Sequence, residues 1–153
     1  MYNALSFEQC TDVITGATVF LDVDGTLMPD NSLTATDVVL AKVKELAVNN
    51  RVLLCTNKRN PDRWAMLETL FGLPVITRRH KKPSRKVLDE AGGIGRSRVV
   101  IGDKYLTDGL FAKRIGARFL KVERKLSGRE TVMTKAVNFF DDLLWNLTQK
   151  RFS

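Results

Sequence analysis

Short apolar runs alternate along the chain with longer segments in which apolar residues recur at helical spacing. The apolar runs predict buried strands at residues 19–23, 51–56, 75–77, 99–102 and 118–122. Capping residues and helical periodicity predict helices at 34–49, 60–72 and 84–91, and a fourth that ends at Gly116. Strands that alternate with helices form a mostly parallel sheet with helices on both faces. The predicted fold class is therefore α/β, a three-layer Rossmann-like arrangement.

The last segment predicts a further helix at residues 129–149. It carries an apolar stripe made of Val132, Ala136, Phe139, Phe140, Leu143 and Leu147. We favour an interpretation in which this stripe packs on the sheet; the alternative is apolar contact with a membrane through Phe139, Phe140 and Trp145. Because the sequence has no repeat, linker or low-complexity tract, we expect one domain over residues 1–153, with its core at 17–122.

The composition is that of an ordinary water-soluble protein, with 44% hydrophobic and 27% charged residues. No apolar run approaches the roughly 20 residues that cross a bilayer, and residues 1–16 lack the features of a signal peptide. A cytoplasmic location is the expectation, with peripheral contact to a membrane as an extension of it. Cys10 and Cys55 have no metal-ligand spacing, so we interpret both as reduced packing residues.

The formal net charge of +8 is unevenly distributed along the chain. Residues 1–76 hold 6 Lys and Arg against 9 Asp and Glu, a net charge of −3, whereas residues 77–153 hold 19 against 8, a net charge of +11. This asymmetry indicates an anionic partner, which can be a phosphate ester, an acidic lipid or a nucleic acid. The alternative is a basic surface that is simply solvated.

Polar residues follow several of the predicted strands. Asp22 and Asp24 end the first strand, Thr56 and Asn57 the second, and Asp103 a later one. In open α/β sheets ligands bind beyond the carboxyl ends of the strands, so these side chains should converge. A divalent cation can relieve the repulsion between neighbouring carboxylates. Gly25 and Thr26 allow a sharp turn and offer backbone N–H groups to a phosphate.

The run LDVDGTL at residues 21–27 resembles the first motif of the haloacid dehalogenase (HAD) superfamily. The other three motifs of that superfamily have counterparts in the expected order: Thr56 after VLLC, Lys82 before Pro83, and Gly102-Asp103 with Asp108. A calcium-binding EF-hand loop is the alternative for the first run, but it needs its glycine at position 6 and helical flanks. Here the glycine comes fourth and a predicted strand precedes it.

The resemblance implies a magnesium-dependent phosphatase, a hydrolase that forms an aspartyl-phosphate on Asp22. Asp24 would serve as general acid and base, Thr56 would hydrogen-bond a phosphoryl oxygen, and Lys82 would neutralise the nucleophile and the transferred group. Lys81 is a weaker candidate for the role of Lys82. The implied Mg²⁺ ligands are Asp22, the backbone carbonyl of Asp24, Asp103 and Asp108. The expected substrate contacts are Gly25, Thr26, Asn57 and Lys81.

The intervals between motifs are short: 29 residues separate Gly25 from Cys55, and 25 separate Thr56 from Lys82. We therefore expect no cap domain. HKKPSRK at residues 80–86 and the later run VVIGDKYLTDGLFAKRIGA resemble the uncapped IIIA branch, which contains phosphatidylglycerophosphate phosphatases. That resemblance implies conversion of phosphatidylglycerophosphate to phosphatidylglycerol. One difference is Gly25, where that branch commonly has Asn.

The basic second half fits an anionic lipid substrate and peripheral membrane contact, since cations crowd near Lys82. Alternative substrates are soluble sugar phosphates, nucleotides and polynucleotide 3′-phosphates. Nucleic acid is less favoured because stacking aromatic residues are missing from the basic run. A binding module with an inactive HAD site is disfavoured because Asp22 and Asp24 are both present.

Overall fold

A sheet of four parallel strands lies at the centre of the computed structural model, which describes residues 4–151. The strands are β1 (Thr18–Leu21), β2 (Arg51–Leu54), β3 (Arg98–Gly102) and β4 (Arg118–Lys121). Their order across the sheet is β2-β1-β3-β4, so β1 and β3 are the inner pair, with Thr18 opposite both Arg51 and Arg98. This arrangement confirms the predicted α/β class with a Rossmann-like parallel sheet.

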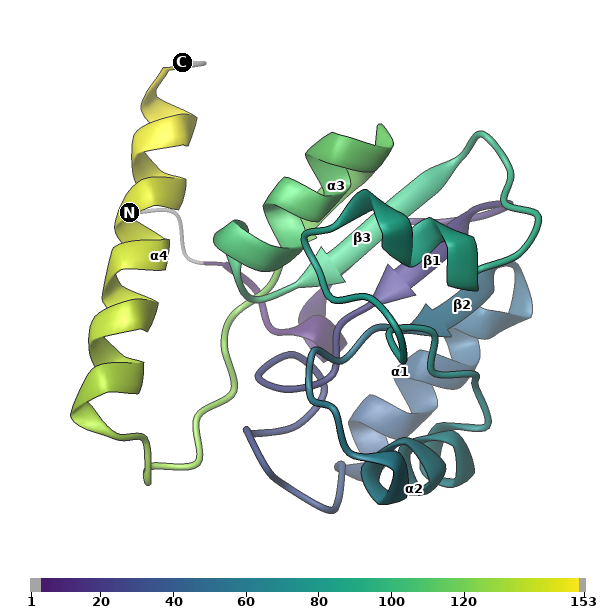
Figure 1. Ribbon diagram of the computed structural model, residues 1–153, viewed down its shortest axis with the longest axis horizontal. Helices are drawn as coiled ribbons and strands as arrows, with labels where there is room; N and C mark the ends of the chain where they lie inside the picture. Colours follow the sequence, from purple (N-terminus) through teal and green to yellow (C-terminus); the bar gives the residue numbers. More distant parts are fainter. Residues whose placement is uncertain (1–3, 152–153) are drawn as a thin grey trace.

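Helices cover both faces of the sheet (Figure 1). The α-helices are α1 (Asp37–Val48), α2 (Pro61–Phe71), α3 (Leu110–Ile115) and α4 (Val132–Lys150). Three shorter helical turns are η1 (Phe7–Gln9), η2 (Arg85–Glu90) and η3 (Tyr105–Gly109). The first two α-helices pack on one face of the sheet, and α3 and η2 pack on the other.

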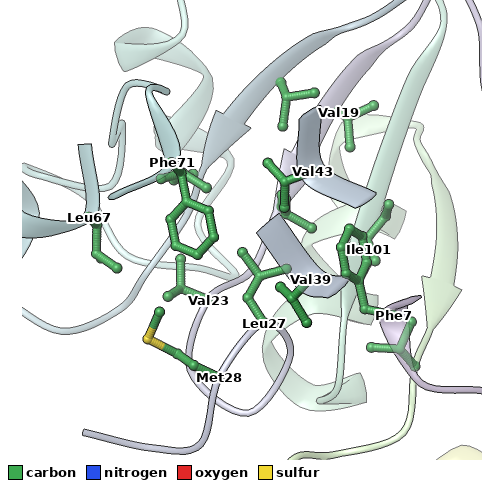
Figure 2. Packing of buried hydrophobic residues seen from close by; sticks show 14 of the residues in the cluster. Phe7, Val19, Val23, Leu27, Met28, Val39, Val43, Leu67, Phe71 and Ile101 are labelled. Carbon is green, nitrogen blue, oxygen red and sulfur yellow. The ribbon is translucent and has the colours of Figure 1, made fainter. Parts of the chain in front are cut away.

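The alternation of side chains along β1 divides the core into two clusters. Val19 and Leu21 point toward α1 and α2, where Val39 and Val43 join them (Figure 2). Phe20 points to the opposite face and meets Phe111 of α3 edge-to-face, with ring centroids 5.4 Å apart. Because all of β1 is buried, its residues after Thr18 form a continuous apolar run, and the polar residues Asp22 and Asp24 come only after the strand ends.

Several helix ends lie where the sequence predicts them. The Thr36 hydroxyl caps α1 by accepting a hydrogen bond from the backbone N–H of Val39. Asn60 caps α2 in the same way, with Pro61 at the first helical position, and Gly72 ends that helix. Gly116 likewise ends α3.

The strand predicted at residues 75–77 does not form. Val75 makes a single bridge to Leu54, and the chain then turns away from the sheet. Beyond this bridge, the carboxylate of Glu90 accepts hydrogen bonds from the backbone N–H groups of Arg78, Arg79 and His80. These groups are therefore unavailable to a neighbouring strand.

Three predicted helices differ from the observed ones. The segment predicted at 84–91 is a 3₁₀-helix, η2, capped by the Ser84 side chain. The helix that ends at Gly116 is preceded by the π-helical turn η3, in which the backbone N–H of Gly109 donates to the carbonyl of Lys104. The last helix begins at Val132 rather than 129, because Thr131 caps it through the N–H of Thr134.

The apolar stripe of α4 does not pack on the sheet, contrary to the favoured interpretation of the sequence. Phe139 and Phe140 are 66% and 61% exposed, and Leu147 is 51% exposed. Trp145, which the alternative interpretation assigned to a membrane, instead lies half-buried between Tyr105 and Phe119. Within residues 4–151, no helix is both long enough and apolar enough to cross a membrane.

The cap of α2 provides a test of the fold near the predicted site. Replacing Asn60 with Ala should lower the free energy of unfolding by about 1 kcal/mol, because the N–H of Arg63 loses its acceptor. Urea denaturation followed by circular dichroism measures this change. Asn60→Asp, which keeps an acceptor, is the matched control and should retain most of the stability; equal losses in the two variants would contradict the capping role.

Candidate active site

The polar residues predicted at strand ends do meet at one edge of the sheet. Asp22 and Asp24 follow β1, Thr56 follows β2, and Asp103 follows β3. Lys82 joins them from the loop between α2 and η2. The parallel direction of the strands brings these sequence-distant residues together.

Lys82 holds two carboxylates at the centre of this cluster. Its Nζ lies 2.6 Å from Asp22 Oδ1 and 2.5 Å from Asp108 Oδ1. The three residues are buried, with Asp108 fully inaccessible to solvent. A charge at such depth is tolerated only when it is paired, and here one ammonium serves two acids.

Burial and mutual repulsion oppose ionisation of the two acids. Burial raises the pKa of Asp22 to about 7; the Lys82 ammonium counteracts part of this rise, and the neighbouring Asp103 adds to it. Burial and the charge of Asp22 raise the pKa of Asp108 to about 6. Burial alone would lower the pKa of Lys82, but Asp108 and Asp22 outweigh it and raise that pKa, so Lys82 is a cation. A second cation near the acids would favour their ionised forms.

The carboxylates of Asp22, Asp103 and Asp108 form a group that can hold a metal ion, with one oxygen from each within 4.8 Å of the others. The hydroxyl of Thr26 lies between two of them, 2.9 Å from Asp22 Oδ2 and 3.2 Å from Asp103 Oδ1. A hydroxyl has one hydrogen, so it satisfies only one of these oxygens at a time. Carboxylate oxygens whose negative charge is only partly neutralised are suitable ligands for a hard divalent cation such as Mg²⁺.

Two glycines, Gly25 and Gly102, lack a Cβ at positions where the carboxylates of Asp103 and Asp108 come close to the backbone. A Cβ at Gly102 would lie 2.2 Å from Asp108 Oδ2, so no larger residue fits there without moving this carboxylate. A Cβ at Gly25 would lie 2.7 Å from Asp103 Oδ2, and Gly25 has a φ of +85° that other residues rarely adopt. Both glycines of the predicted motifs thus have a steric role in the cluster.

Asp24 lies beside this cluster in a separate set of contacts. Its Oδ2 accepts a hydrogen bond from the Thr56 hydroxyl at 2.8 Å, and its Oδ1 lies 2.5 Å from Arg63 Nη2. Arg63 also donates to the carbonyl of Ser32, while its buried Nε has no partner among the described residues. The Asp24 carboxylate is therefore held in a fixed orientation, and Thr56 directs its hydroxyl to Asp24 in this structure.

Asn57, a predicted substrate contact, holds the backbone of Lys82, whereas Lys81 lies outside the cluster. The Asn57 side chain accepts from the backbone N–H of Lys82 at 2.8 Å and donates to its carbonyl at 2.9 Å. Asn57 thus fixes the peptide of Lys82, whose bond to Pro83 is cis. Lys81 is exposed, so Lys82 rather than Lys81 is the lysine of the cluster.

The backbone N–H groups of Gly25 and Thr26 are engaged inside their own loop. The N–H of Gly25 donates to the carbonyl of Met28 at 2.7 Å, and that of Thr26 donates to the carbonyl of Val23 at 3.1 Å. From the sequence we expected both N–H groups to be available to a phosphate. The turn uses them instead, and the contribution of Thr26 to the site is its buried hydroxyl.

Three residues join the site without having been recognised from the sequence as part of it. Arg63 contacts Asp24, and Arg124 Nε lies 2.8 Å from Asp103 Oδ2. Asp141 of α4 accepts hydrogen bonds from the backbone N–H groups of Tyr105 and Leu106, at the start of the turn that carries Asp108. Only spatial proximity identifies them, because Arg63 looks like an ordinary helix residue and Arg124 belongs to a general basic run.

Comparison with known proteins does not assign the chain to a family: no family model matches it, and none of the curated proteins matches it. The likeness to the HAD superfamily therefore stays a hypothesis based on the residues themselves.

The close approach of Gly25 to Asp103 can be tested by comparing two glycines with positive φ. Gly16 has a φ of +65° and open space where a Cβ would lie, whereas a Cβ at Gly25 would collide with Asp103. Both alanine variants bear backbone strain, but Gly25→Ala should lose about 1–3 kcal/mol more unfolding free energy than Gly16→Ala because of the collision. Denaturant titration of both proteins measures the difference. Equal stability of the two variants would contradict the packing described.

Proposed function

We propose that this protein is a Mg²⁺-dependent phosphomonoester hydrolase that acts through an aspartyl-phosphate on Asp22. The observation that carries the proposal is the pairing of Asp22 and Asp108 with the buried ammonium of Lys82 at the carboxyl edge of the sheet. Transfer of a phosphoryl group needs positioning and charge neutralisation more than any other form of catalysis. A fixed cation beside a fixed carboxylate supplies both.

In the first step a carboxylate oxygen of Asp22 attacks phosphorus, and the bond from phosphorus to the ester oxygen breaks. Asp24 gives its proton to the departing alkoxide. In the second step Asp24 takes a proton from water, which attacks the phosphorus of the aspartyl-phosphate and restores Asp22. Lys82 neutralises charge on Asp22 and on the transferred group throughout.

Two contacts of Asp24 hold its carboxyl group in one orientation. Thr56 and Arg63 bind its two oxygens and fix the direction of the carboxyl group. Arg63 acts as a positioning residue in this proposal, since its contact is with Asp24. The Asp24 side chain is 11% exposed, which leaves access for water in the second step.

The metal ion would be held by Asp22, Asp103, Asp108 and the backbone carbonyl of Asp24. When bound, Mg²⁺ supplies Lewis-acid stabilisation of the phosphoryl oxygens. The residues themselves favour such an ion because three carboxylates that lie together, Asp22, Asp103 and Asp108, pair with only two cations among the described residues, Lys82 and Arg124.

For the substrate we propose an anionic lipid phosphate of the phosphatidylglycerophosphate type. Exposed cations surround the loop that carries Lys82: Arg79, Lys81, Arg85 and Lys86. They favour a substrate embedded in an anionic surface. A phosphate-release screen with Mg²⁺ across lipid, sugar, nucleotide and polynucleotide esters tests this choice. Efficient turnover of a soluble ester with none of the lipid would overturn it.

Loss of the nucleophile should abolish turnover. Asp22→Asn removes the attacking carboxylate oxygen but keeps the shape, so phosphate release should fall to the uncatalysed background. Lys44→Gln, which changes an exposed cation of α1 outside the site, is a control that should keep most of the activity. Mg²⁺-dependent turnover by Asp22→Asn would contradict the assignment.

Loss of the general acid should depend on the leaving group. Asp24→Asn should slow hydrolysis of an alkyl phosphate by about 10²–10⁴-fold, because the alkoxide then leaves without a proton. The loss should be smaller with p-nitrophenyl phosphate, whose leaving group departs readily as an anion. Equal losses for both substrates in steady-state kinetics would exclude Asp24 as the acid.

Metal binding should stabilise the folded protein. Saturating Mg²⁺ raises the free energy of unfolding by about 2.7 kcal/mol at one hundred times its dissociation constant, and thermal melting measures the shift. Asp103→Asn should lose most of the Mg²⁺-dependent shift, whatever its stability without metal. Asp12→Asn, which removes a surface partner of Arg118, should keep it. An unchanged shift in Asp103→Asn would argue against Asp103 as a ligand.

A further inference from the structure

The helix α4 turns its polar side toward the body of the protein and its apolar side toward solvent. Three residues make its main contacts with the body. Asp141 caps the turn at Tyr105, Asp142 pairs with Lys121 and Arg124, and Trp145 packs on Phe119. Figure 1 shows α4 at the edge of the molecule, apart from the helices that cover the sheet. This orientation is the reverse of that expected for a helix that belongs to a core.

The outward side of α4 is apolar along the whole helix. Its exposed members, between 40% and 85% accessible, are Val132, Met133, Val137, Phe139, Phe140, Leu143, Leu144 and Leu147. At 100° per residue they occupy an arc of about 160°. We call this set the outer face of α4. A continuous exposed apolar face of this length marks an interaction surface rather than the scattered apolar residues of an ordinary exterior.

The charges of α4 are divided between its two sides. Both acidic residues, Asp141 and Asp142, contact the body. The basic residues Lys135, Lys150 and Arg151 are all exposed. The outer face therefore has cations at its margins and at its end, and no carboxylate of α4 lies on that side.

We propose that the outer face of α4 binds the surface of an anionic lipid bilayer. Phe139 and Phe140 would enter the boundary between head groups and acyl chains, while Lys135 and Arg151 would lie among the anionic head groups. The two phenyl rings lie side by side, with centroids 6.1 Å apart, and form the most prominent aromatic pair on this face.

Charge complementarity favours a bilayer over a second copy of the chain. Two outer faces packed together would bring Lys135 and Arg151 of both copies into one interface. Neither copy would offer an α4 carboxylate there, and like charges across an interface oppose association. An anionic bilayer supplies the opposite charge that the outer face lacks.

The position of α4 relates this surface to the candidate active site. Thr134 and Asn138, on the body-facing side of α4, line a small hollow together with Asp24 and Asp103. A bilayer bound to the outer face would thus lie one helix thickness from the catalytic carboxylates. The inference goes beyond the proposed phosphatase activity and does not depend on it.

Vesicle co-sedimentation of the full chain tests the proposal. Wild-type protein should bind vesicles of phosphatidylcholine with phosphatidylglycerol more tightly than vesicles of phosphatidylcholine alone, and high salt should weaken the binding. The double variant Phe139→Ser/Phe140→Ser should lower the partition coefficient by roughly tenfold or more, since it removes both rings that would enter the bilayer. Lys135→Glu should weaken binding only to the anionic vesicles.

Matched controls separate this surface from general hydrophobicity and from catalysis. Val13→Ser/Val48→Ser removes two exposed apolar residues outside α4 and should bind like wild type. Asp22→Asn should also bind like wild type, so failure of the phosphatase proposal leaves this test intact. Circular dichroism checks that each variant is folded.

Three outcomes would overturn the proposal. One is equal binding of wild type to anionic and neutral vesicles, or binding to neither. Another is binding that the double phenylalanine variant leaves unchanged. The third is a dimer in analytical ultracentrifugation that the same double variant abolishes, which would assign the outer face to a second copy.

Discussion

The buried ammonium of Lys82 is the interaction on which the candidate site depends. It contacts Asp22 and Asp108 at hydrogen-bond distance, where neither acid would ionise readily alone because burial raises both pKa values. Removing one partner from a buried charge cluster leaves the other charges uncompensated, which lowers the free energy of unfolding by several kcal/mol. The same cluster therefore both constrains the fold and prepares one carboxylate for nucleophilic attack in the proposed reaction.

The parallel sheet makes this arrangement possible. After a polar first residue each inner strand is apolar, and both end at the same edge, so the first polar residues after β1 and β3 are neighbours. Gly25 and Gly102 then admit the carboxylates of Asp103 and Asp108 at distances that any Cβ would prevent. The segment after β4 closes another side, where the N–H of Lys125 donates to the carbonyl of Gly25.

Local patterns in the sequence were sufficient for the α/β class, the caps of α1 and α2, and the convergence of Asp22, Asp24, Thr56 and Asp103. Lys82 was assigned to the site only through the resemblance to the HAD superfamily. Contacts that arise only in three dimensions were not predictable. Arg63 reaches Asp24 because Asp24 lies beside the first turn of α2, and Glu90 accepts hydrogen bonds from the backbone of residues 78–80. The periodicity of α4 predicted an amphipathic helix, but it carried no information about which side faces the body. Asp141, Asp142 and Trp145 decide that orientation.

Chemical trapping at Asp22 tests the central claim most directly. The protein is mixed with Mg²⁺ and a phosphate ester during turnover, quenched in acid and reduced with borohydride, which converts an aspartyl-phosphate into homoserine. Mass spectrometry of the peptides that contain Asp22, Asp24, Asp103 and Asp108 then locates the modified residue. The account predicts homoserine in place of Asp22 and no modification of Asp24, Asp103 or Asp108. Homoserine at another aspartate, or sustained turnover with no trapped residue under conditions that trap acyl phosphates, would contradict it.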